Sequence, residues 1–382
     1  MVVLAGRQQP IHVLGAGAVG LLFASHLRRS GHPVTVLLRS QSAAERFCRR
    51  GGRIDVVDDW ARPPPAESGA AAAAADGIQA EALAAQGDGG RGVISHLLVA
   101  TKAQDTIRAF AAVRHRLGPQ STVALLQNGM GVLDAIQAEF YPQSQSQSQG
   151  GPVAATPTFI VGTTSHGCYR VPAEDFVTHH ASMGACSFAV HPPLPGAPTT
   201  LPESAQEMAD ALRRLPLAAV EASWPDLHLQ LLLKLAANAV INPTTALVGC
   251  CNGHIWPDNP PASSSLGAAA TAGYLPLACA EIAAVYERAY PDLRSKLAAA
   301  AVEQHVTHIL RVTARNRSSM MQDIAAGRAT EVDWINGHLV RLGERHGVPT
   351  PINTLLCALV KLRETSGPAG EQPQAAAAAT TA

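Results

Sequence analysis

The chain has 382 residues and no formal net charge, because 29 Lys and Arg balance 29 Asp and Glu. At roughly 150 residues per domain, this length predicts two domains or three. Charged residues make up only 15% of the chain and aromatic residues only 4%. Such a chain lacks the cationic field and the stacking surface that nucleic acids or anionic membranes require, so we expect neither as a partner.

Seven cysteines are scattered along the chain, an odd number with no C-x-x-C pair. This usage predicts a reducing compartment, without a disulfide framework and without a metal site. The longest apolar runs fall short of the ~20 residues that span a bilayer. Only ten residues precede the first strand-like run, which are too few for a signal peptide. We expect a soluble, cytoplasmic protein.

The first predicted elements form a strand–turn–helix unit. Residues 11–14 are a short apolar run, a glycine-rich turn follows at 15–20, and helical spacing continues from 21 to 29. A second β-rich run covers 34–38. This βαβ opening predicts a parallel sheet with helices on its faces. Further buried strands are predicted near 95–100 and 122–126.

The chain changes character near residue 225, where long Leu- and Ala-rich periodic stretches begin. The fold class predicted is therefore an α/β domain over 1–224 followed by an all-α domain over 225–366, with a disordered tail at 367–382. Low-complexity insertions are predicted near 61–92 and 143–151. The helices expected in the second domain are 226–242 (ended by Pro243), 275–290, 293–314, 319–327, 331–346 and 353–364.

The glycine turn has the spacing G-x-G-x-x-G between a predicted strand and a predicted helix. In a dinucleotide-binding turn, Gly15 would permit the tight bend, Gly17 would let the backbone approach a pyrophosphate, and Gly20 would let helix and strand pack closely. The helix N-terminus adds free N–H groups and a positive dipole end. The alternative is a plain glycine turn, but the context favours dinucleotide binding.

The second predicted strand ends at Arg39 rather than at an acidic residue. NAD sites place Asp or Glu there, about 20 residues after the turn, to hold the ribose 2′-hydroxyl. A guanidinium can instead bind a 2′-phosphate through a charge-assisted fork. The alternative is a solvated arginine in a loop. The pattern favours NADP(H) as the cofactor.

One lysine stands alone on an apolar helix. Between Leu227 and Pro257 the only Asp, Glu, Lys or Arg is Lys234, and it forms a polar stripe with Gln230, Asn238 and Asn242 at a spacing of four. An unpartnered buried ammonium is costly, so this lysine favours a ligand or a counter-charge. The alternative is a lysine whose head reaches solvent from the helix bundle.

Four further candidates depend on their place in the fold. Ser319-x-x-Gln322 has the form of a capping box that begins a short helix. Glu331 taken alone is most simply a first-turn carboxylate favoured by the helix dipole. Lys102 and Asn128 follow predicted strands, and loops after strand carboxyl ends border the ligand crevice of an open α/β sheet.

Together these segments resemble the ketopantoate reductase family. The similarity extends over most of the chain outside the insertions and the tail, and the blocks at 234–247 and 318–337 are the most specific. The segments occur in family order as VLGAGAVG at 13–20, TKA at 101–103, QNGMG at 127–131, KLAANAVINPTTAL at 234–247, CNG at 251–253 and SSMMQDIAAGRATEVDWING at 318–337.

The resemblance implies a Rossmann domain followed by an α-helical domain and assigns roles by position. It implies that Lys234 binds substrate and serves as general acid, and that Glu331 lies near cofactor and active site. Substrate-binding positions are Asn238, Asn242, Asn252 and Ser319. Cofactor-binding positions are Gly15, Ala16, Gly17, Ala18, Val19, Gly20, Arg39, Lys102, Asn128, Cys168 and Glu331.

The reaction implied by the resemblance is NADPH-dependent reduction of 2-dehydropantoate to (R)-pantoate, a step toward pantothenate and coenzyme A. The expected partner is this small molecule, and the expected protein is a monomer or a homodimer. Two alternatives remain open. One is an NADP(H)-dependent reductase of another 2-oxo acid, and the other is a non-catalytic NADP(H)-sensing module.

Overall fold

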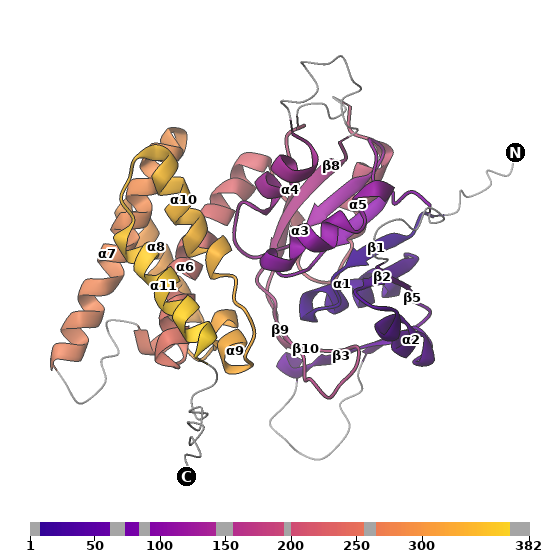
Figure 1. Cartoon of the computed structure of the whole chain (residues 1–382), viewed down its shortest axis with the longest axis horizontal. Coiled ribbons are helices and arrows are strands. Elements are labelled where there is room, and N and C mark those ends of the chain that lie inside the picture. Colours follow the sequence, from indigo (N-terminus) through magenta and orange to yellow (C-terminus); the bar gives the residue numbers. More distant parts are fainter. Residues whose placement is uncertain are drawn as a thin grey trace, which may run out of the picture. The chain divides into compact units, whose positions relative to one another are not determined.

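The chain forms two compact units, Met1–His228 and Leu229–Ala382. All described strands belong to the first unit, and the second consists of helices (Figure 1). This confirms the predicted fold class. The insertion predicted at 143–151 and the predicted tail lie outside the described residues. The computed structural model describes residues 8–61, 73–83, 92–142, 156–194, 200–255 and 265–366.

An eight-stranded sheet organises the first unit. All neighbouring strands are parallel except β8 and β11. The chain leaves β1 toward β2 on one side and later adds β6 on the other, so β1 lies at the point where strand order reverses. In spatial order the strands are β12 (Ala219–Glu221), β11 (Cys186–Val190), β8 (Thr158–Thr164), β7 (Thr122–Leu125), β6 (His96–Val99), β1 (Ile11–Leu14), β2 (Val34–Leu38) and β5 (Gln79–Ala82).

A second, four-stranded sheet packs against helix α1 (Ala18–Arg29), which also contacts β1 and β2 of the large sheet (Figure 1). The apolar side chains of α1 are therefore covered from both sides, and eight consecutive residues from Gly20 to Leu27 are buried. In spatial order the strands of this small sheet are β4 (Ala73–Ala75), β3 (Ile54–Asp58), β10 (Val177–Ser182) and β9 (Gly167–Tyr169).

The predicted insertion at 61–92 is wrong for part of its length. Its described residues include β4, which pairs with β3, and β5, which extends the large sheet beside β2. Short alanine-rich strands carry no alternating pattern, so composition concealed them. The other helical elements of this unit are α2 (Gln41–Arg49), η1 (Asp59–Ala61), α3 (Ala103–Ala111), η2 (Arg114–Arg116), α4 (Val132–Phe140) and α5 (Glu203–Arg213).

In the second unit, α7 packs against α8, α10 and α11, and α10 also packs against α11. These contacts explain the apolar periodicity of the sequence beyond residue 225. The helices are α6 (Trp224–Val248), α7 (Ser265–Ala289), α8 (Ala299–Val312), α9 (Ser319–Ala325), α10 (Asn336–His346) and α11 (Pro351–Thr365), with short 3-10 turns η4 (Asn252–Ile255), η5 (Pro291–Leu293) and η6 (Val332–Trp334).

Several helix limits differ from those predicted. Helix α7 begins at Ser265, ten residues before the predicted start at 275, and α8 begins at Ala299, six residues after the predicted start at 293. Helix α6 does not end before Pro243 but continues to Val248. The helix predicted at 331–346 is interrupted at Ile335, whose ψ of −87° separates η6 from α10. The residue that caps α9 is Ser318, not Ser319, because the Ser318 hydroxyl accepts a hydrogen bond from the Met321 amide.

Helix α6 is the one described helix whose length and hydropathy match those of a membrane span. Two thirds of its most apolar window is buried inside the protein. That burial is typical of the core helix of a globular protein, where neighbouring side chains replace lipid.

Candidate functional site

The glycine turn after β1 is shaped by two close backbone approaches and one open space. Gly15 has a φ of +110°, and a Cβ there would lie 2.7 Å from the Thr101 nitrogen. A Cβ on Gly20 would overlap the Gly15 carbonyl oxygen. A Cβ on Gly17 would meet no heavy atom within 4 Å. The first and third glycines are thus required by packing, whereas the second leaves a space that a ligand can fill.

The N-terminus of α1 is open to an anion. Its cap residue is Gly17, which has no side chain to accept from the first-turn amides, and no acidic residue lies in the first turn. The first regular helical bond runs from the Leu21 amide to the Gly17 carbonyl. The amides of Ala18, Val19 and Gly20 therefore precede the helical ladder, at the positive end of the helix dipole.

Three other predicted cofactor residues follow parallel strands of the same sheet. Arg39 follows β2 and is exposed, while Lys102 follows β6 and Asn128 follows β7, both half-buried. Because β1, β2, β6 and β7 are parallel, their carboxyl ends share one edge of the sheet. The structure thus brings these three residues to the edge that carries the glycine turn, where open α/β sheets bind ligands.

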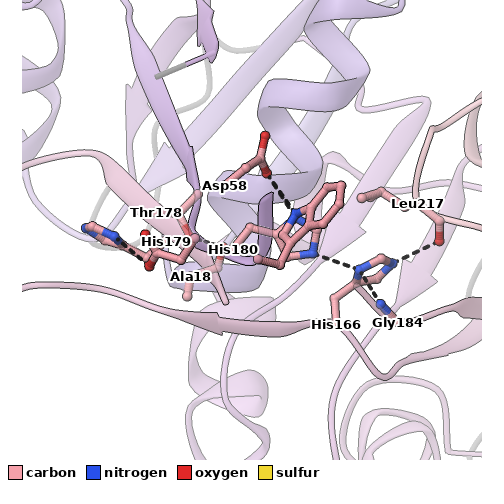
Figure 2. Close-up of polar contacts among 10 residues, drawn as sticks. Ala18, Asp58, His166, Thr178, His179, His180, Gly184 and Leu217 are labelled. Atoms are coloured by element: carbon pink, nitrogen blue, oxygen red, sulfur yellow. Dashed lines mark hydrogen bonds and ion pairs between the residues drawn. The ribbon is translucent and has the colours of Figure 1, made fainter. Parts of the chain in front are cut away.

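Two side chains that the sequence did not single out, Thr178 on β10 and Arg170 directly after β9, bind backbone carbonyls of the glycine turn and the start of α1. The Thr178 hydroxyl donates to the Ala18 carbonyl at 3.0 Å (Figure 2), and the Arg170 guanidinium donates to the Ala16 carbonyl at 3.1 Å. Both bonds span more than 150 residues of sequence. No local pattern could have indicated them, because they depend on the packing of β9 and β10 against α1.

Two buried histidines, His166 just before β9 and His180 on β10, contact each other beside this site (Figure 2). His166 Nε2 lies 2.9 Å from the Leu217 carbonyl, so Nε2 donates, and the Gly184 amide donates to Nδ1 at 3.1 Å. Since Nδ1 accepts, His180 Nε2 must donate to it across 2.9 Å. Burial lowers the pKa of His166, which agrees with this neutral form. His180 Nδ1 faces Asp58 Oδ1 at 3.3 Å.

Cys168 occupies the middle of β9, opposite His180 on β10. Its side chain packs against the core between the sheets, and burial raises the pKa of its thiol to about 12. The thiol is therefore protonated at neutral pH. What Cys168 can offer a cofactor is its backbone and its apolar surface rather than a thiolate.

In the second unit, the polar stripe on α6 runs from solvent into the interior. Gln230 is exposed, Lys234 and Asn238 are half-buried, and Asn242 is only 7% exposed. The spacing of four residues places these side chains on one face of the helix. The stripe therefore places one cation and two amides along a face that leads into the protein.

Asn252 carries a buried acceptor without a donor. The Thr313 hydroxyl donates to the Ile309 carbonyl at 2.6 Å, so Thr313 must accept from Asn252 Nδ2 at 2.9 Å. This fixes the amide orientation and leaves Asn252 Oδ1 buried with no donor among the described residues. A buried acceptor of this kind is costly unless a ligand supplies the missing donor.

Ser319 lies beside these groups and is free of the capping role predicted for it. Ser318 caps α9, and its hydroxyl lies 2.7 Å from the Thr245 hydroxyl on α6. The backbone N–H of Asn252 donates to the backbone carbonyl of Asn316 at 3.0 Å. The end of α6, Asn252 and the start of α9 thus converge, with the Ser319 side chain exposed.

Glu331 is buried, with 6% of its surface exposed, and it precedes η6 as its cap residue. The residue before it, Thr330, is held by Glu364 of α11, which the sequence did not indicate. The Glu364 carboxylate accepts from the Thr330 amide at 2.7 Å and from the Thr330 hydroxyl at 2.6 Å. The position near cofactor and active site that the resemblance implies for Glu331 stays a prediction.

Two family models match the two units of the chain. "Ketopantoate reductase PanE/ApbA" matches residues 11–193, and "Ketopantoate reductase PanE/ApbA C terminal" matches residues 226–364. The chain belongs to the ketopantoate reductase family. This confirms the family that the sequence motifs indicated.

Curated relatives are similar to this chain in sequence over nearly its full length. A 2-dehydropantoate 2-reductase of Shigella flexneri is 29% identical over 93% of this chain and 95% of its own length. One of Pyrobaculum aerophilum is 28% identical over 93% of this chain and 98% of its own length. The fold also matches a solved 2-dehydropantoate 2-reductase of Geobacter metallireducens, at a TM-score of 0.66, 19% identity and coverage of 92% and 99%.

A solved D-mandelate dehydrogenase, bound to NADH and anilino(oxo)acetate, has the same fold. Its TM-score is 0.68 at 18% identity, covering 94% of this chain and 99% of that one. One fold thus occurs in enzymes named for different substrates, so the fold alone does not decide the substrate.

Proposed function

We propose that this family member reduces 2-dehydropantoate to (R)-pantoate with NADPH. The observation that carries the proposal is the α6 stripe, on which Lys234, Asn238 and Asn242 are increasingly buried. Beyond the end of α6, Asn252 Oδ1 is a buried acceptor with no donor among the described residues. A 2-oxo acid with a hydroxyl group offers what these residues need: a ketone oxygen, a carboxylate and a hydroxyl donor. The relatives named 2-dehydropantoate 2-reductase support this substrate.

The first unit fits a dinucleotide. The space over Gly17 and the amides of Ala18, Val19 and Gly20 suit a pyrophosphate, and Arg39 suits the 2′-phosphate that distinguishes NADP from NAD. Lys102 and Asn128 follow neighbouring strand ends and would bind the rest of the cofactor. When bound, NADPH supplies the hydride that reduces the C2 ketone.

The residues of the second unit would handle the charge that develops on the ketone oxygen. The Lys234 ammonium would stabilise this oxyanion and donate a proton to it, which completes the alcohol. Asn238, Asn242 and Ser319 would orient the substrate carboxylate, and Asn252 Oδ1 would accept from the substrate hydroxyl. The buried Glu331 carboxylate would lie near Lys234 and cofactor.

The test is NADPH oxidation by the purified protein in the presence of 2-dehydropantoate. We expect a higher kcat/KM for this substrate than for pyruvate or phenylglyoxylate, because only 2-dehydropantoate offers both a carboxylate and a hydroxyl to the asparagines. A preference for phenylglyoxylate would instead favour the other 2-oxo acid reductase, which the D-mandelate dehydrogenase fold makes worth testing. NADPH binding without turnover of any oxo acid would favour the sensing module.

Three finer expectations, on partner, location and oligomeric state, belong to the same proposal. The partner would be this small molecule, and the protein would act in the cytoplasm as a monomer or a homodimer. Size-exclusion chromatography with light scattering, with and without NADPH, would decide the oligomeric state.

A further inference from the structure

Helix α6 contains a break in its hydrogen bonding at the centre of the proposed substrate site. Pro243 lies inside the helix and has no N–H, so it cannot donate to the carbonyl four residues earlier, which belongs to Ala239. Ala239 is 1% exposed, so water does not supply the missing donor. A buried carbonyl without a partner would destabilise a helix at this point.

A side chain from another helix supplies the donor. Asn336, the first residue of α10, donates from Nδ2 to the Ala239 carbonyl at 2.8 Å. The same Nδ2 group donates to Asn353 Oδ1 at 2.9 Å. Asn336 is fully buried, and its own Oδ1 has no donor among the described residues. The side chain thus bears the cost of an unpaired acceptor while both of its N–H groups are used.

The directions of these bonds are fixed from their far end. The Glu281 carboxylate on α7 can only accept, and it does so from Asn353 Nδ2 at 2.7 Å and from the Ile352 amide at 2.8 Å. Asn353 must therefore present its oxygen to Asn336, and Asn336 must present its nitrogen to α6. Glu281, Asn353 and Asn336, here called the amide clamp, link α7, α11 and α10 to the broken turn of α6.

We propose that the amide clamp is a positioning device for the substrate residues of α6. The turn 239–243, where Pro243 removes a hydrogen bond, contains Asn242 and follows Asn238, so the direction that the helix takes through this turn sets where Asn242 lies relative to Lys234. By holding the freed carbonyl, Asn336 selects one such direction. This inference rests on the proposed function only for its catalytic consequence, because the hydrogen bonding can be tested without substrate.

The decisive experiment is a double-mutant cycle between Asn336→Leu and Pro243→Ala. Replacing Pro243 with alanine restores an N–H at position 243, which can bind the Ala239 carbonyl within the helix. We expect Asn336→Leu alone to lower the urea midpoint of unfolding markedly, and to lower it much less in the Pro243→Ala background. Additive effects on the midpoint would overturn the proposal.

Two further readouts keep the test decisive if Asn336→Leu alone does not fold. In the double variant, the amide at position 243 should exchange slowly with deuterium, and rapid exchange there would contradict the assigned bonding. Pro243→Ala alone should fold, yet it should lower kcat about tenfold and raise KM for 2-dehydropantoate, because a shift of even 1 Å in substrate-orienting groups is costly. Unchanged kcat and KM would refute the positioning role.

The controls separate positioning from general loss of stability and from failure of the proposed function. Leu339→Val, one turn further along α10, removes buried apolar volume without touching the clamp, so its effect should be additive with Pro243→Ala and should spare kcat. The Kd of NADPH should change less than about twofold in every variant, because the glycine turn, Arg39 and the residues that follow β6 and β7 all lie in the other unit. Wild-type protein without turnover would refute the function but leave the stability cycle valid.

Discussion

The two units prepare for a ligand in opposite ways. The first offers backbone: amides at the start of α1, and a space at Gly17 that a single methyl group would enter. The second offers side chains on one helix, whose own broken backbone is held by the amide clamp. Backbone groups suit an invariant phosphate, whereas side chains can be matched to one substrate. Changes in the first unit should therefore alter cofactor affinity, and changes in the second should alter turnover.

The largest effect that would sharpen this contrast is expected at Lys234. Lys234→Ala removes the proposed proton donor and the cation opposite the developing oxyanion, so kcat should fall by about a thousandfold. Steady-state kinetics measures the loss of turnover, and fluorescence titration with NADPH measures cofactor affinity, which should stay close to that of the wild type. Gln230→Ala, one turn earlier on the exposed part of the stripe, serves as the control. Near-normal turnover of Lys234→Ala would exclude Lys234 as the acid.

A smaller effect, confined to cofactor choice, is expected at Arg39. Arg39→Asp replaces a guanidinium that can bind the 2′-phosphate with a carboxylate that repels it and can bind a 2′-hydroxyl. The ratio of kcat/KM for NADPH over that for NADH should fall by about a hundredfold. Arg49→Asp, at the other end of α2, is the matched charge reversal and should leave the ratio unchanged. If Arg39→Asp and Arg49→Asp had the same ratio, Arg39 would not be a residue that binds the 2′-phosphate.

The glycine turn allows a test within the first unit alone. Gly17→Ala places a methyl group in the open space, so it should weaken NADPH binding about tenfold while the unfolding midpoint stays near that of the wild type. Gly20→Ala forces a Cβ into the Gly15 carbonyl, so it should cost about 2 kcal/mol of stability. If both variants lost stability equally, the space at Gly17 would not be a ligand site.

Sequence patterns predicted most elements and which candidate residues follow the strand ends, because both depend on local spacing. Short apolar runs beside the glycine motif were enough to predict the strands at 11–14 and 34–38. A spacing of four residues was enough to predict the polar stripe of α6. The end of α6 was mispredicted because the donor that replaces the missing Pro243 N–H lies on Asn336, 97 residues from Ala239. Thr178, Arg170 and Glu364 were missed for the same reason, since each acts on a backbone group far away in the sequence.

The smallest expected effect is on the pH dependence of stability, because each unit buries a histidine. Both ring nitrogens of His26 on α1 are buried without a partner among the described residues. Burial, aided by Arg29, lowers the pKa of His26 from its ordinary value of 6.5 to about 4. In the second unit, burial likewise lowers the pKa of His338 on α10 to about 4, aided by Arg341 and Arg345.

The sign of the resulting pH dependence follows from proton uptake. Between pH 6.5 and about 4, the unfolded chain binds a proton at His26 that the folded chain does not, so stability falls as the pH is lowered through this window. His26→Phe should recover about 1 kcal/mol at about pH 5.5 relative to its own effect at neutral pH. Urea unfolding followed at both pH values measures this difference, and His338→Phe is the matched variant in the other unit. If the two units unfold separately, His26→Phe should protect only the first unit from acid. An identical pH dependence in wild type and His26→Phe would mean that His26 is charged or hydrated in the folded protein.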